Sequence, residues 1–541
     1  MAWKIDTGST SSGIHMNIHA NSGVLTYSSG CSTSNRDNCG NCGLPNGGTV
    51  VALLEPDITN TKFDNYSDVR STITYTTDVQ TCDQEWLIMD FSSNSNSYKV
   101  LDHCNGFDAK MVDECKYIVY GAPMIRTQDF KTSGVHEIKY RTISDTIKSN
   151  TLTGTTELTY IYFPHKYNNT DFGGVNTKKI EANAFSDNIN LSGITLSAVE
   201  EIGDKAFFNC YGLTSIDWGD SKCPNTDCCS GCSQETKIGD SAFENCRSLE
   251  TLGDFGSLNT LTTLGTRAFK NCTSLKEVTL PTGLTAISAE TFMNCYQLSS
   301  ATISDGMIMI GNSAFTNCYA LKEINIPNTV TSLGINSFSN CSSASALTLS
   351  NKLTVIPPGC FYNCTRITSI TIPDSVETIG QAAFGLCGSS NVVENFTITI
   401  GSGVKTIGDD AFAQCRTLKS INIPNNVETI GDGAFYGCNW LTSVTIWNGV
   451  TSISGNAFAT CINLSQVTIG SGIASIGAQA FYGCDMLTTV TINAVDPPTL
   501  GSSVFLMCDN IEAIYVPSGS VDRYKAASGW REYASKIQEI P

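Results

Sequence analysis

The chain has 541 residues, of which 15% are charged, and its formal net charge at pH 7 is −18. Nucleic-acid backbones and anionic lipid surfaces both attract basic proteins, so this acidity argues against either one as a partner. No apolar run reaches the about 18 residues that a membrane-spanning helix needs, so we expect no membrane span.

The N-terminal segment, residues 1–8, lacks the apolar stretch and the cleavage site of a secretory signal. Three explanations fit this segment: a leader that has been removed, a cytosolic protein, or a virion component that cell lysis releases. They differ in the location that they imply and leave the fold prediction unchanged.

Residues 1–150 contain no repeat and are rich in Thr, Ser, Asn, Asp and Tyr. The runs at residues 69–75 and 137–143 alternate apolar with polar side chains, which is typical of half-buried strands between turns. We therefore predict a small β-rich N-terminal domain over residues 1–150, of immunoglobulin-like or docking type.

Residues 151–495 are dominated by a repeated unit of 23 residues, of which residues 407–429 are the clearest copy. Longer steps precede Phe243, Phe269 and Phe412, and they indicate insertions into loops, which tolerate changes of length. One phenylalanine marks each unit: Phe185, Phe207, Phe243, Phe269, Phe292, Phe315, Phe338, Phe361, Phe384, Phe412, Phe435, Phe458, Phe481 and Phe505.

Each unit has the pattern of one solenoid coil. In Leu-x-x-Ile-x-Ile the last two apolar residues alternate with polar ones, as in a strand with one buried face, and a following proline ends the strand. The spacing of Ala-Phe-x-x-Cys suits a single helical turn with its apolar side inward. Because one coil cannot bury this face alone, we predict a mainly β solenoid with parallel strands on one face and short helical or 3-10 turns.

Residues 496–541 hold the last copy of the pattern and a tail. The tail reads as a short amphipathic helix at residues 521–537, which would cover the last coil. An uncovered end coil would expose its apolar face, so we predict that this segment is a C-terminal cap.

The repeated motif IGxxAFxxCxxLxxIxIP closely resembles the leucine-rich repeat family, specifically the bacterial type of the BspA-like surface proteins. The resemblance spans about residues 155–517. It implies a leucine-rich repeat solenoid, and it implies adhesion to host proteins, cells or polysaccharide.

Thirteen of the 24 cysteines sit three residues after a marker phenylalanine, from Cys210 to Cys508. A row of redox or metal sites is one interpretation of this column. The other is core filling, because free cysteine is among the most often buried residue types, and we favour it.

Two other groups of cysteines lie outside the column. Four cysteines within ten residues could form two disulfides or hold a tetrahedral zinc ion, and we favour disulfides. They are Cys223, Cys228, Cys229 and Cys232. In the N-terminal region Cys31 precedes a Cys-x-x-Cys pair formed by Cys39 and Cys42. Such a pair supplies two of the four ligands of a zinc site, and the sequence has no second pair of this kind, so we again favour disulfides.

The polar residue between the two buried strand positions of each coil is a candidate for ligand binding. These residues suit a solvated strand face in any case, but they would also form a long polar platform for protein or glycan. They are Thr279, Thr302, Asn325, Thr348, Thr371, Thr399, Asn422, Thr445, Thr468 and Thr491. Trp447, together with Trp218 and Trp440, would add aromatic contacts along an edge.

Catalytic patterns are missing from the sequence. None of the five histidines lies in a recognisable nucleophile motif, and there is no phosphate-binding or HExxH motif, so we predict no enzyme activity and no cofactor. We predict a binding or adhesion protein for protein or polysaccharide, extracellular or on a cell surface. The alternatives are a virion fibre or decoration protein, and an N-terminal carbohydrate-binding or enzymatic module with the repeats as spacer.

Overall fold

The computed structural model describes residues 178–196, 199–218 and 235–541, together with Ser149 and the backbone of the strands that precede residue 178. The chain divides into two compact units, Met1–Leu275 and Lys276–Pro541. The predicted boundaries at residues 150 and 495 remain predictions.

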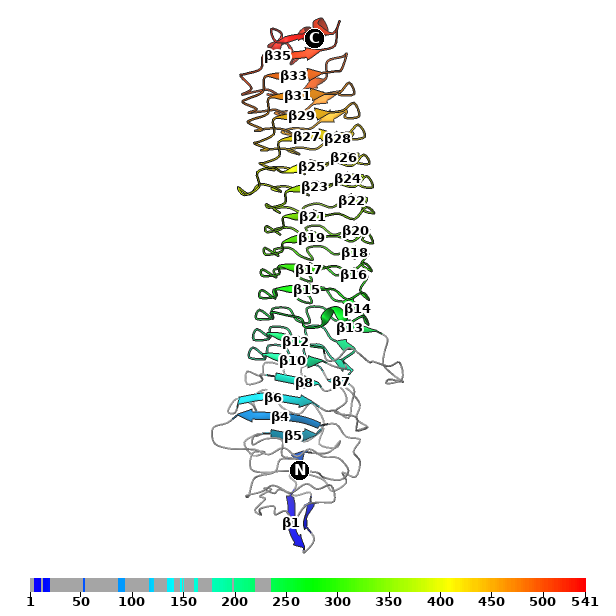
Figure 1. Cartoon of the computed structure of the whole chain (residues 1–541), viewed down its shortest axis with the longest axis vertical. Helices are drawn as coiled ribbons and strands as arrows, with labels where there is room; N and C mark the ends of the chain where they lie inside the picture. The colour runs from blue at the N-terminus through cyan, green and yellow to red at the C-terminus, as the bar shows by residue number, and fades with distance from the viewer. Residues whose placement is uncertain are drawn as a thin grey trace. The chain divides into compact units, whose positions relative to one another are not determined.

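The first unit contains a hairpin and a seven-stranded sheet in which N-terminal strands join repeat strands (Figure 1). β6 pairs with β8 in parallel, whereas β4 is antiparallel to both of its neighbours. Strands are therefore present within residues 1–150. β6 overlaps the predicted strand at residues 137–143, whereas the predicted strand at residues 69–75 lies outside the described residues. The hairpin is β1 (Lys4–Thr10) with β2 (Gly13–His19), and the sheet runs β12 (Ser215–Asp217), β10 (Gly193–Leu196), β8 (Tyr160–Phe163), β6 (Gly134–Tyr140), β4 (Trp86–Ser92), β5 (Lys116–Tyr120) and β3 (Ala52–Leu53).

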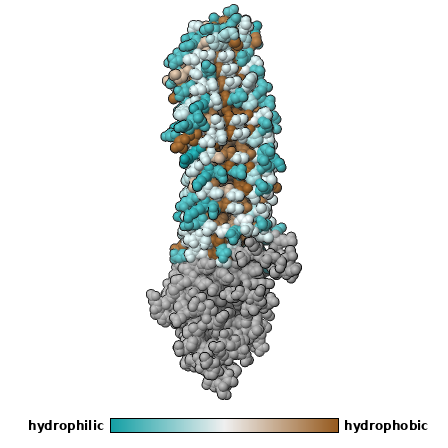
Figure 2. All heavy atoms as spheres, in the orientation of Figure 1, coloured by the Kyte–Doolittle hydropathy of each residue, from teal (hydrophilic) through white to brown (hydrophobic). Residues whose placement is uncertain are grey.

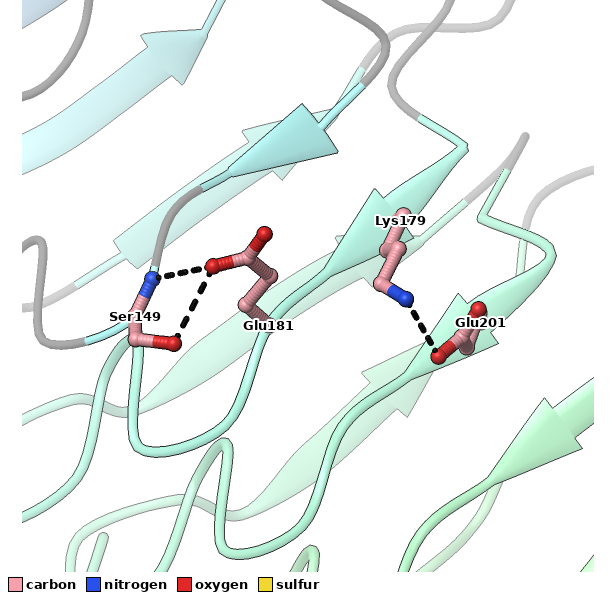
Figure 3. Close-up of polar contacts among 4 residues, drawn as sticks. All are labelled: Ser149, Lys179, Glu181 and Glu201. Carbon is pink, nitrogen blue, oxygen red and sulfur yellow. Dashed lines mark hydrogen bonds and ion pairs between the residues drawn. The ribbon is translucent and has the colours of Figure 1, made fainter.

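A second sheet of this unit is parallel throughout. It runs β14 (Leu261–Leu264), β13 (Thr236–Ile238), β11 (Glu201–Ile202), β9 (Lys179–Ile180) and β7 (Thr146–Ile147). Polar contacts link its neighbouring strands (Figure 3): Ser149 donates to Glu181 from its backbone N–H (3.0 Å) and hydroxyl (3.1 Å). The Lys179 ammonium lies 2.8 Å from the Glu201 carboxylate, and this hydrogen bond raises the pKa of Lys179.

The second unit consists of parallel strands in two rows, one strand from each row per coil (Figure 1). The first row holds β15 (Glu277–Thr279), β17 (Ser300–Thr302), β19 (Glu323–Asn325), β21 (Ala346–Thr348), β23 (Ser369–Thr371), β25 (Thr397–Thr399), β27 (Ser420–Ile423), β29 (Ser443–Ile446), β31 (Gln466–Ile469), β33 (Thr489–Ile492), β35 (Ala513–Val516) and β36 (Ile537–Glu539). The second holds β16 (Ala286–Ile287), β18 (Met309–Ile310), β20 (Ser332–Leu333), β22 (Val355–Ile356), β24 (Thr378–Ile379), β26 (Thr406–Ile407), β28 (Thr429–Ile430), β30 (Ser452–Ile453), β32 (Ser475–Ile476) and β34 (Thr499–Leu500). The predicted solenoid with parallel strands is thus confirmed.

The core of the second unit is a stack of the marker phenylalanines. Phe435 is fully buried and stacks on Phe412 and Phe458 with ring centroids 5.3 and 5.1 Å away. The same stacking runs from Phe292 to Phe505, and Phe185, Phe207, Phe243 and Phe269 stack alike in the first unit.

The Ala-Phe-x-x-Cys segment forms consecutive hydrogen-bonded turns, and the predicted helical turn is not observed at this place. Gly433 and Gly437, on either side of Phe435, have φ of +59° and +68°. Their N–H groups and that of Phe435 donate to carbonyls of the next coil, whereas the N–H of Tyr436 bonds within the coil. A helix needs every N–H group to bond within its own segment, so it cannot form where alternate N–H groups bond to the next coil. The residues with positive φ turn these N–H groups toward the next coil.

The C-terminal segment packs on the last coil, and its helix is shorter than the predicted one. The helix α2 (Val521–Ala526) is followed by a 3-10 turn, η4 (Arg531–Tyr533), and by β36, which pairs with β35. The buried Trp530 donates to the Pro498 carbonyl at 2.9 Å and packs against Phe505. Gly529, with a φ of +81°, lies in the stretch where the predicted helix would have continued.

Candidate functional site

The ten predicted platform residues occupy equivalent places in the first strand row of the second unit, and we call them the strand face. Seven are exposed and three, Thr445, Thr468 and Thr491, are half-buried. Parallel register places them side by side, as Thr445 pairs with Asn422 and with Thr468. Members on paired strands are therefore about 4.8 Å apart, which is the usual spacing between such strands.

The alternation of burial along each strand turns these side chains outward. In β27 the flanking Ile421 and Ile423 are buried and Asn422 is exposed. Hydrophobic burial of the two isoleucines fixes the register, since a slip by one residue would place both in water. The strand face continues at Tyr515 of β35, which pairs with Thr491. Tyr515 is not among the ten predicted residues, although its place in the repeat pattern could have identified it.

Trp447 lies directly beside the strand face. It follows the last residue of β29, its side chain is 48% exposed, and its indole Nε1–H donates to Asn422 Oδ1 at 2.6 Å. This bond holds a large aromatic surface across two neighbouring coils. A solvent-exposed aromatic ring held in one orientation is a good anchor for a partner, because little rotamer entropy is lost on binding.

The other two predicted edge tryptophans differ from each other. Trp440 is 45% exposed, and the Lys419 ammonium lies 5.9 Å from its ring centroid. Trp218 is only 4% exposed, because it packs on Phe255 and donates to the Leu252 carbonyl at 2.7 Å. The prediction that Trp218 offers an aromatic contact at the surface is therefore wrong. The 26-residue step before Phe269 brings in Phe255, which covers it.

The column cysteines are buried free thiols, as the core-filling interpretation predicts. The structure adds a contact that the sequence did not suggest. Most of these thiols lie within 3.5 Å of the carbonyl oxygen of the marker phenylalanine one coil earlier, as Cys438 does with Phe412 at 3.3 Å. Burial raises the pKa of the thiols in the middle of the column, as it does for Cys415, Cys438 and Cys461, the last to about 12, so these thiols stay protonated and are poor nucleophiles.

The remaining predicted cysteine sites lie outside the described residues. They are Cys31, Cys39, Cys42, Cys223, Cys228, Cys229 and Cys232. Within the described part of the chain, no group of three or more His, Cys, Asp or Glu side chains is placed to hold a metal ion. In that same part, no helix is long and apolar enough to cross a membrane.

A cleft of about 290 Å³ opens beside the coil that carries the longer step before Phe412. The extra residues form a loop at residues 388–395, which we call the inserted loop. Ser389, Asn391, Val393, Glu394, Arg416, Thr417, Asn439 and Trp440 line the cleft. The break in repeat length was the sequence signal for this site, but it did not reveal which residues gather there.

The surface of the molecule is chemically mixed. Figure 2 shows one face, on which a narrow line of apolar residues runs between polar and weakly polar ones. The strand face and the cleft each bring an exposed tryptophan together with polar side chains.

The family comparison covers most of the chain. The BspA type leucine-rich repeat region matches at residues 123–234, 174–261, 236–344, 285–404 and 405–526. No curated protein matches the chain.

Similar solved structures include a leucine-rich cell surface protein from Faecalibacterium prausnitzii (26% identity, 61% of this chain and 90% of that one, TM-score 0.37). Leucine-rich repeat proteins from Bacteroides ovatus (19%, 76% and 95%, TM-score 0.41) and Eubacterium ventriosum (18%, 69% and 92%, TM-score 0.36) are also similar. The repeat pattern, the coil geometry and the family match agree. The chain belongs to the BspA-type leucine-rich repeat family.

Proposed function

We propose that this protein is a non-enzymatic binding protein that attaches to an extended protein or glycan chain through its strand face. The observation that carries the proposal is Trp447, nearly half exposed and tied to Asn422 by a 2.6 Å hydrogen bond. It places an oriented aromatic ring beside a regular row of hydroxyl and amide groups. These groups donate and accept hydrogen bonds at a fixed spacing, which suits a linear partner.

We further propose an extracellular or cell-surface location, supported by the family to which the chain belongs. The absence of recognisable catalytic motifs supports the non-enzymatic part of the proposal. The low charge of the strand face points to hydrogen bonds and stacking as the source of affinity. Binding should therefore depend only weakly on salt concentration.

Arrays of glycans and of extracellular proteins test the proposal. The full chain and its Trp447→Ala variant are applied in parallel, and the strongest hit is then titrated with both. We expect the wild type to bind specifically and the variant to bind with an affinity at least about tenfold lower, because a central aromatic anchor typically contributes about 2 kcal/mol or more. Equal binding by the two proteins would remove Trp447 and its surroundings as the contact surface.

A further inference from the structure

We propose that the cleft beside the inserted loop is a saccharide-binding site that takes a single pyranose ring against Trp440. This goes beyond the proposed function, because it concerns other residues and does not depend on the strand face. Three features carry it: the position of the cleft between coils, its exposed tryptophan, and polar groups that keep bonding capacity free within the described part of the chain.

The shape follows from three successive coils. The backbone N–H of Trp440 donates to the Arg416 carbonyl at 3.0 Å, and that of Ser390 donates to the Thr365 carbonyl at 3.0 Å in the same manner. Ser390, Thr417 and Trp440 therefore occupy one column, with the small Thr417 in the middle. The inserted loop and Trp440 stand two coils apart, roughly 10 Å at the spacing of paired strands. The cleft is lined by both, and we call the space between them the slot.

The walls of the slot are anchored to the core. Val393 and Phe396 are buried, and the Thr417 hydroxyl donates to the Gly388 carbonyl at 2.5 Å. The N–H of Val393 closes a turn onto the Ser390 carbonyl at 2.9 Å. A loop fixed in this way loses little conformational entropy when a ligand binds, which favours affinity in a small site.

The chemistry of the lining matches a sugar. Trp440 offers an aromatic face for the C–H groups of a pyranose, and Asn391, Glu394 and Arg416 supply acceptors and donors for its hydroxyl groups. Within the described part of the chain, Glu394 forms no ion pair, and Arg416 donates to the Gln414 side chain at 3.1 Å with one of its nitrogens only. The volume of about 290 Å³ is at the small end of ligand pockets, which range over about 300–1,000 Å³.

The test uses the full chain and a panel of soluble methyl pyranosides that includes neutral, N-acetylated and uronic members. Saturation-transfer NMR identifies a binder, and calorimetry measures its affinity. We expect at least one pyranoside to bind. Its affinity should fall at least about tenfold in Trp440→Ala, since this change removes the main contact. Met486→Ala is the matched control, because Met486 occupies the same column two coils further on and is 54% exposed.

Two further variants make the outcome decisive. Asn391→Ala lies on the exposed loop and should weaken the sugar without lowering the melting temperature, so it serves if Trp440→Ala fails to fold. Trp447→Ala tests whether the pyranoside occupies the strand face instead: a loss of binding in this variant, with none in Trp440→Ala, would overturn the proposal. The proposal is overturned if no pyranoside binds, or if the binder is insensitive to both Trp440→Ala and Asn391→Ala.

Discussion

Replacing Cys438 tests why cysteine recurs in the core of this solenoid. Its thiol is fully buried, and the sulfur lies 3.3 Å from the Phe412 carbonyl oxygen. That carbonyl also accepts the backbone N–H of Cys415 at 3.3 Å. After removal of the thiol this carbonyl still accepts one hydrogen bond. We therefore expect the loss of stability to come mainly from the lost packing contacts of the sulfur.

The expected cost of Cys438→Ala combines two contributions. Burial of the sulfur is worth about 0.8 kcal/mol, by comparison with a buried methylene. A void of roughly 20 Å³ adds about 0.5 kcal/mol at about 24 cal/mol per Å³. We expect Cys438→Ala to lower the unfolding free energy of this region by about 1–2 kcal/mol.

Cys438→Ser should cost more than Cys438→Ala. A C–O bond is shorter than a C–S bond, so the hydroxyl would start farther than 3.3 Å from the Phe412 carbonyl, beyond good O–H···O range. A buried hydroxyl without a good partner costs about 1–3 kcal/mol in addition to the lost volume. The expected order of stability is wild type, then alanine, then serine.

Hydrogen exchange by mass spectrometry on peptides that cover residues 430–461 measures the local free energy of opening in each variant. Cys508→Ser, followed on peptides of the last coil that contain residue 508, is the control, because its thiol is 6% exposed and the penalty should be smaller. If the serine variant were as stable as the wild type, hydrogen bonding rather than packing would explain the cysteines.

Three other predictions concern the stack, a surface turn and the cap. Phe435→Leu should lower the local unfolding free energy by about 1–3 kcal/mol, because two stacked pairs worth about 0.5–1.5 kcal/mol each are lost; hydrogen exchange measures it, and an unchanged value would contradict it. Hydrogen bonds from Ser402 lower the pKa of Asp374 in the folded protein. The ionised carboxylate therefore stabilises the fold at pH values above the ordinary pKa of 3.8, and this contribution is lost as the pH falls through the lowered pKa. The melting-temperature difference between wild type and Asp374→Ala should therefore shrink on acidification, and a constant difference would refute this. Trp530→Ala should cost about 3–5 kcal/mol and expose the end coil, so size-exclusion chromatography should show self-association, whereas a stable monomer would show that the cap is dispensable.

Much of the solenoid could be predicted because the repeat fixes its buried positions. Phe435 and Cys438 recur at constant offsets, and a side chain that recurs in every coil must occupy the same place in the stack. The outward direction of Asn422 followed equally from the alternation of its strand.

Contacts between coils could not be predicted in the same way. The offsets of Ala, Phe and Cys fit a helical turn, and only the bonding of alternate N–H groups to the next coil distinguishes the observed turns from it. Trp218 is covered by Phe255, which lies outside the regular pattern and 37 positions further along the chain. The cleft likewise depends on residues from three coils and on the path of an irregular loop, which periodicity does not describe.

The central claim, that the strand face is the contact surface, is tested most directly by the affinity of the array-identified ligand for two matched variants. Thr445→Arg places a bulky charge within the strand face, and Thr429→Arg places it on an exposed threonine of the second strand row. Thr429 is exposed and Thr445 is half-buried on the outward side of its strand, so neither change enters the core, and the melting temperature of each variant is measured beside its affinity. The account predicts that binding weakens at least about tenfold for Thr445→Arg alone, a change of 1.4 kcal/mol. Equal affinity for the two variants would contradict it.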